Sequence, residues 1–217
     1  MRNFPAARVN HLQMGTGRVA ELADADLVER AVGGERDAFE AIYRRYQAIV
    51  YRFARSMTGS AAAAEDVTQE VFVVLMRDLA RYEPRRATLS TYLYGVARNI
   101  TRARLRREQP FVHLDEVSSQ QAEPAGLDDP SAALARSQDL IRLRKAIVGL
   151  PSRYREVVIL CDLHGLSYAD AANVIDTPVG TLRSRLHRAR NLLIERLRCP
   201  DPNGSRRPVS SVARCLA

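Results

Sequence analysis

Apolar residues recur at intervals of three and four along most of this chain, which is the period of a helix with one buried face. The clearest stripe predicts a helix over 36–57. A second helix is expected after Ser60, which can act as its N-cap. A third is expected to open near Thr88 or Ser90 and to end among the arginines of 104–107. No segment alternates with period two for long enough to predict a strand, so the expected fold class is all-α.

An acidic, proline-containing segment separates these helices from a second group. Residues 108–135 hold six acidic residues, three prolines and no lysine or arginine, which is typical of a flexible linker. A chain of 217 residues has room for two domains of about 100 residues each. The expected division is a disordered N-terminal extension at 1–23, a helical domain at 24–107, a flexible acidic linker at 108–135, a second helical domain at 136–198 and a disordered tail at 199–217.

The second group of helices has the order of a helix-turn-helix. The helices are expected at 140–148, 152–163, 168–175 and 178–198. Ser167 can cap the third of them, and Pro178, after Asp176 and Thr177, suits the first turn of the last. A short helix, a tight turn and a long basic helix together predict a DNA-binding helix-turn-helix.

The last helix has one apolar side and one basic side. On a helical wheel the core side holds Val179, Leu182, Leu186, Ala189, Leu193 and Leu197. The opposite side holds Gly180, Thr181, Ser184, His187, Arg188 and Asn191, flanked by Arg183 and Arg185. Between 183 and 198 there are six arginines and one acid, whereas an ordinary solvated face mixes both signs. We therefore favour DNA contact over a merely solvated face.

The first group of helices ends in its own basic cluster, Arg98, Arg102, Arg104, Arg106 and Arg107, preceded by Tyr82, Tyr92 and Tyr94. Aromatic rings beside arginines suit single-stranded bases, because a ring stacks on any base while guanidinium groups hold the backbone. Core tyrosines and a basic helix C-terminus would give the same pattern, and without the second group of helices the two interpretations would be even.

The helix after Ser60 carries an acidic face with Glu65, Asp66, Gln69 and Glu70. Acidic side chains do not bind nucleic acid, so this face either meets a protein partner with basic helices or faces water. The residues alone favour the solvated face.

Charge and motifs narrow the class of protein. The net charge is +8, and Lys145 is the only lysine among 33 basic residues, which favours a nucleic-acid partner unless a codon bias explains the arginines. No apolar run approaches the roughly 20 residues of a membrane span and no secretory signal is visible, so no membrane insertion and a cytoplasmic location are expected. The sequence contains no P-loop, no nucleotide-binding glycine motif and no carboxylate cluster, so no motif in it indicates an enzyme.

The three cysteines, Cys161, Cys199 and Cys215, are widely spaced, which predicts reduced thiols. Cys161 and His164 lie three apart but lack the further ligands of a closed zinc site. We expect no metal site, no cofactor and no catalytic residue.

Two stretches resemble the extracytoplasmic-function (ECF) group of bacterial RNA polymerase sigma factors, which keep only regions 2 and 4 of larger sigma factors. The first is AEDVTQEVFVVLMRDL together with LSTYLYGVARNITRARLRR, within 64–107. The second is LPSRYREVVILCDLHGLSYADAANVIDTPVGTLRSRLHRAR, at 150–190. The resemblance implies a region 2 bundle followed by a region 4 helix-turn-helix.

The resemblance also implies partners and roles. It assigns Asp66, Gln69 and Glu70 to the clamp helices of the polymerase β′ subunit. It assigns the loop of 82–89 and Tyr82, Tyr92, Arg98, Asn99 and Arg102 to the minus-ten promoter element. It assigns Thr181, Arg183, Ser184, Arg185, His187 and Arg188 to the minus-thirty-five element. Contact of the second domain with the β flap and control by an anti-sigma factor are further implications.

Some positions depart from the family pattern, and one alternative stays open. Leu89 and Tyr92 stand where the family commonly has Phe and Trp, which leaves a smaller aromatic surface. A helix-turn-helix regulator that never engages polymerase would explain the second domain but not the acidic and aromatic features of the first. The two domains could also close on one another and hide both DNA surfaces.

Overall fold

The computed structural model describes residues 22–108 and 130–198, and within these ranges every regular element is helical. The helices are α2 (Asp24–Val32), α3 (Arg36–Thr58), α4 (Ala61–Asp78), α5 (Leu89–Glu108), α6 (Pro130–Val148), α7 (Ser152–Val158), α8 (Tyr168–Ile175) and α9 (Val179–Arg198). A 3₁₀ turn, η1 (Leu79–Arg81), follows α4, and a π-helical turn, η2 (Ile159–Leu163), follows α7. The all-α prediction is confirmed.

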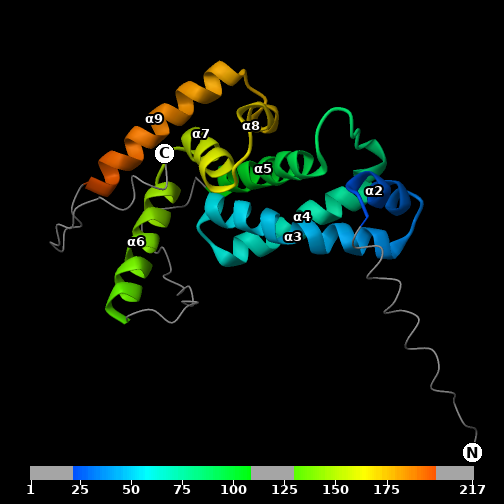
Figure 1. Ribbon diagram of the computed structural model, residues 1–217, viewed down its shortest axis with the longest axis horizontal. Coiled ribbons are helices and arrows are strands. Elements are labelled where there is room, and N and C mark those ends of the chain that lie inside the picture. Colours follow the sequence, from blue (N-terminus) through cyan, green and yellow to red (C-terminus); the bar gives the residue numbers. More distant parts are fainter. Residues whose placement is uncertain (1–21, 109–129, 199–217) are drawn as a thin grey trace, which may run out of the picture.

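The first domain is formed by α2–α5 (Figure 1). Helices α3, α4 and α5 pack on one another around the fully buried side chains of Phe53, Val71 and Leu93. The predicted N-cap of α4 is confirmed, because the Ser60 hydroxyl accepts a hydrogen bond from the Ala63 amide at 3.3 Å. Gly59 makes the preceding turn with a φ of 77°, a left-handed conformation that favours glycine.

The second domain is formed by α6–α9, with α8 and α9 as the helix-turn-helix. The Ser167 hydroxyl caps α8 by accepting from the Asp170 amide at 3.0 Å, as predicted. Asp176 turns the chain between the two helices with a φ of 51°. Arg190 of α9 donates to the Asp162 carboxylate of η2 at 2.6 Å, which ties the last helix to the preceding turn.

Two element boundaries differ from the sequence prediction. α6 begins at Pro130, ten residues before the expected start at 140 and inside the predicted linker. The alanine-containing sequence after Pro130 favours a helix, and proline is well suited to the first helical position. The sequence analysis also did not predict α2. The remainder of the linker (109–129), most of the N-terminal extension (1–21) and the tail (199–217) lie outside the described residues.

The two domains are packed together and share one hydrophobic core. α5 contacts α8, and α3 contacts α6 and η2 (Figure 1). The Tyr94 hydroxyl and His164 Nδ1 share a hydrogen bond of 2.7 Å across the domain boundary. The ring of Phe53 lies edge-on to both of these rings. No helix in the described ranges is long and apolar enough to cross a membrane.

The buried imidazole predicts an acid-sensitive domain interface. Burial, followed by the nearby charge of Arg52, lowers the pKa of His164 from 6.5 to about 4. Protonation therefore favours the state in which His164 is exposed, so the packed arrangement loses stability as the pH falls from about 6.5 toward 4. The melting temperature should fall more between pH 7 and pH 5.5 for the wild type than for His164→Asn, which keeps a hydrogen-bonding group but does not titrate. Parallel losses in the two proteins would contradict this.

Candidate nucleic-acid interface

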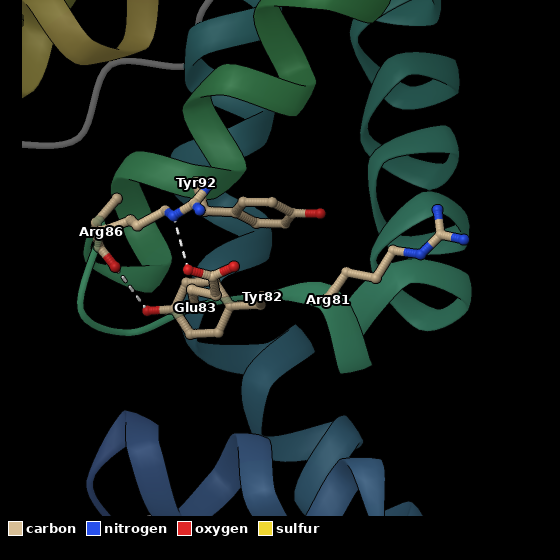
Figure 2. Close-up of a pocket in the computed structure, with 6 residues that line it drawn as sticks. Arg81, Tyr82, Glu83, Arg86 and Tyr92 are labelled. Atoms are coloured by element: carbon tan, nitrogen blue, oxygen red, sulfur yellow. Dashed lines mark hydrogen bonds and ion pairs between the residues drawn. The ribbon is translucent and has the colours of Figure 1, made fainter.

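Two tyrosines form a small pocket in the first domain, where the loop after η1 leads into α5. The rings of Tyr82 and Tyr92 meet edge to face, with centroids 5.4 Å apart. The Tyr82 hydroxyl donates to the carbonyl of Ala87 at 2.9 Å and so closes the loop on itself. The pocket has a volume of about 200 Å³ and is lined by Arg81, Tyr82, Glu83, Arg86, Ala87 and Tyr92 (Figure 2).

The chemistry of this pocket suits one small planar group. Its volume is below the roughly 300 Å³ at which pockets for drug-sized ligands begin. A tyrosine hydroxyl is already neutral at pH 7, and burial raises the pKa of Tyr82 and of Tyr92 further. Arg86 is exposed and pairs with Glu83 at 2.6 Å, while Arg81 is exposed on the other side (Figure 2). Aromatic faces beside exposed guanidinium groups fit an unstacked base and its phosphates.

The other three residues assigned to the minus-ten element lie further along α5 and do not join the pocket. Asn99 is exposed on α5. Arg98 and Arg102 instead face the second domain, where both contact the carboxylate of Glu156 on α7. The structure thus brings Tyr82 and Tyr92 together and leaves the two arginines occupied elsewhere.

The basic side of α9 is exposed, as the helical wheel predicts. Leu182, Leu186, Ala189 and Leu193 are buried, and Val179 and Leu197 are half-buried. On the opposite side Arg183, Ser184, His187 and Arg188 are exposed, and Thr181 and Arg185 are half-buried.

Neighbouring side chains support parts of this surface. The Arg183 guanidinium lies 5.6 Å from the centre of the Tyr168 ring, at cation–π distance. A hydrogen bond from Arg188 lowers the pKa of Tyr154. The Ser184 hydroxyl donates to the Thr181 carbonyl at 2.9 Å. The result is a row of polar and basic side chains on one exposed helix face, which is the form of a major-groove reading helix.

The acidic face of α4 is exposed on the first domain. Asp66, Gln69 and Glu70 all face solvent. The Asp66 carboxylate forms an ion pair with the Arg104 guanidinium of α5, with 2.9 Å between nitrogen and oxygen. Val73 and Met76 continue the same face at helical spacing, with exposed fractions of 59% and 63%. Sequence analysis missed these two residues. Their spacing of four and then three residues after Gln69 places them on its exposed face, whereas Val71, Phe72 and Leu75 in the same apolar run are buried.

Sequence analysis also missed Glu156. It is an acid within the apolar α7–η2 segment and is buried at 3% exposure. An acid in an apolar helix is the signal that could have drawn attention to it, because buried carboxylates need a partner.

The described residues contain no group of three or more metal-ligating side chains. Cys161 is a half-buried free thiol, and burial raises its pKa to about 11, which keeps it protonated. Cys199 and Cys215 lie outside the described residues.

Two family models match the chain in the order of the two domains. The model for Sigma-70 region 2 matches residues 42–111, and the model for Sigma-70, region 4 matches residues 140–193. The first range contains the tyrosine pocket, and the second contains the part of α9 from Val179 to Leu193.

Curated relatives match over most of their length. The ECF RNA polymerase sigma factor SigW of Bacillus subtilis is 29% identical over 184 residues, covering 79% of this chain and 95% of that protein. The ECF RNA polymerase sigma factor SigC of Mycobacterium tuberculosis is 34% identical over 164 residues, covering 76% and 85%. The ECF RNA polymerase sigma-E factor of Escherichia coli is 31% identical over 184 residues, covering 80% and 93%.

Solved structures show the same fold. The sigma factor RpoE, in complex with the anti-sigma factor NepR from Bartonella quintana, matches with a TM-score of 0.61 and 27% identity, covering 75% of this chain and 98% of that chain. CnrH, in complex with the cytosolic domain of CnrY, matches with a TM-score of 0.60 and 23% identity, covering 80% and 96%.

The pocket predicts a loss of single-strand binding on removal of one ring. Tyr92→Leu keeps apolar bulk but removes the stacking surface, so affinity for a single-stranded oligonucleotide should fall by about 1–3 kcal/mol. Fluorescence anisotropy at fixed salt measures this. Tyr51→Leu is the control, because Tyr51 is on α3 and does not line the pocket. If Tyr92→Leu and the wild type bind the oligonucleotide with equal affinity, the tyrosine pocket does not bind a base.

Proposed function

This chain belongs to the ECF group of RNA polymerase sigma factors, and we propose that its two domains divide promoter recognition between them. The first domain captures an unstacked base of the minus-ten element, and the second reads the minus-thirty-five element as duplex. One observation supports this division above all: a tyrosine pocket within the region 2 match is paired with an exposed arginine-rich helix within the region 4 match.

The second domain is proposed to bind through the major groove. Arg183 and Arg188 on α9 are exposed and carry planar donor groups that fit guanine edges or phosphates. Ser184 and Thr181 are small enough to let the helix approach the bases closely. Arg185 and His187 complete the set carried over from the family resemblance.

The first domain is proposed to hold a base flipped out of the duplex. Tyr82 and Tyr92 supply ring faces, and Arg81 and Arg86 are exposed beside the pocket for the backbone. Arg98, Asn99 and Arg102 extend this site along α5, in the same helix as Tyr92. In the packed arrangement Asn99 is the exposed member of these three.

Binding to core polymerase is proposed for the exposed face of α4. Asp66, Gln69 and Glu70 supply charge for the basic clamp helices of the β′ subunit, and Val73 and Met76 add apolar area beside them. The second domain is proposed to contact the β flap. The protein acts by binding alone, with the chemistry supplied by the polymerase, and we place it in the cytoplasm, where that enzyme works.

An anti-sigma factor is a further proposed partner. The sigma factor RpoE, which shares the fold at 27% identity, was solved in complex with the anti-sigma factor NepR. By that likeness this chain also binds a regulatory protein that controls its access to polymerase.

Run-off transcription with purified core polymerase on a promoter library tests the polymerase contact. The wild type should give specific transcripts that Asp66→Arg abolishes, because reversed charge repels a basic partner surface. Glu29→Arg is the matched control, since it reverses an exposed charge on α2 outside the proposed face. If the wild type gives no transcripts yet retains specific duplex DNA, a helix-turn-helix regulator becomes the better description.

Replacing one arginine tests the reading helix. Arg188→Ala should weaken binding to the preferred duplex by about 1–3 kcal/mol and relax the preference at one base pair. Arg198→Ala removes the same charge at the end of α9 and should leave the preference unchanged. An equal loss on all duplexes, with the salt slope reduced by about 0.9, would identify Arg188 as a phosphate contact.

A further inference from the structure

A single carboxylate joins the two domains. Glu156 on α7 receives the Arg98 Nε at 3.0 Å on one oxygen and lies 3.4 Å from the Arg102 Nε through the other. The Glu156 side chain is 4% exposed and that of Arg98 is 11% exposed. The two arginines belong to α5 of the first domain, so this buried ion cluster exists only while the domains are packed together.

The other contacts at this boundary also require the packed arrangement. Arg155, next to Glu156, donates to the carbonyl of Met57 near the end of α3. Tyr94 and His164 share their hydrogen bond a few residues away. Separation of the domains would leave Glu156 without its arginines and would expose apolar surface, so these contacts hold the closed form.

The donors that Arg98 and Arg102 direct at Glu156 are not available to a second anion. Both are proposed to contact the minus-ten element, where phosphate oxygens and base edges would take the same guanidinium donors. In the closed form these donors face Glu156, and Arg98 is almost excluded from solvent. On the reading helix of the second domain, Arg183 and Arg188 are exposed and lie beside Tyr168 and Tyr154 respectively.

We propose that Glu156 is an internal competitor of single-stranded promoter DNA, and that the ion cluster of Glu156, Arg98 and Arg102 is a latch that must open before the first domain binds its DNA. The inference rests on the proposed role of the first domain. It assigns a regulatory contact to the chain itself, separate from any protein that binds it.

Glu156→Gln tests the latch in the full-length chain, because it keeps hydrogen-bonding capacity and removes the charge. If the open form makes up about a tenth of the wild type, releasing the latch should tighten apparent binding of a single-stranded oligonucleotide pool up to about tenfold. Asp162→Asn is the matched control: Asp162 is also a buried carboxylate, but its partner Arg190 lies in the same domain. It should bind single strands like the wild type.

Small-angle scattering without DNA gives a second measurement that does not depend on DNA affinity. Glu156→Gln should have a larger radius of gyration than Asp162→Asn, and saturating single-stranded DNA should expand the wild type. Circular dichroism tests whether each variant is folded. If Glu156→Gln is unfolded, the expansion of the wild type by DNA tests the latch instead.

The outcomes separate the latch from the function on which it rests. The latch is overturned if folded Glu156→Gln binds single strands with the same affinity as the wild type and if DNA does not expand the wild type. That result would leave the first-domain site in place. If neither protein binds single strands and Tyr92→Leu has no effect, the first-domain DNA site itself is wrong and the latch is withdrawn with it.

Discussion

The structure depends on the burial of α5 on two sides. One side packs into the first domain against α3 and α4, where Leu93 and Ala97 are fully buried. Another side packs on α8 of the second domain. Because α5 also carries Arg98 and Arg102, its burial brings cations to a boundary where water is excluded. A buried cation is unfavourable unless it is paired, and Glu156 of the opposing domain supplies the carboxylate that pairs with Arg98.

Local features of the fold were predictable, and long-range ones were not. Ser60 and Ser167 cap their helices because a hydroxyl three residues before a free amide is a local interaction. The buried stripe of α9 follows from spacing alone. Glu156 meets Arg98 across 58 positions of sequence, and no period or motif encodes such a contact. Tyr82 and Tyr92 are ten positions apart in the sequence, but the edge-to-face contact of their rings depends on the turn of the intervening loop.

The two surfaces proposed to face DNA differ in how accessible they are. The α9 face is exposed and needs no rearrangement to approach a duplex. The α5 surface is divided, with an accessible tyrosine pocket at one end and occupied arginines further along. In the packed arrangement, therefore, the α9 face and the tyrosine pocket are accessible, while Arg98 and Arg102 are held by Glu156.

The packing of the two domains restricts which residues can replace Gly59. Its left-handed turn between α3 and α4 is a matter for the first domain, but a β-carbon there would lie 3.2 Å from a methyl group of Val148, at the end of α6 in the second. Any larger residue would therefore be disfavoured twice: its backbone would be strained at this φ, and its β-carbon would crowd Val148 of the other domain. Tolerance at this turn is set jointly by both domains, so the position would accept change more readily in a chain whose domains stay apart.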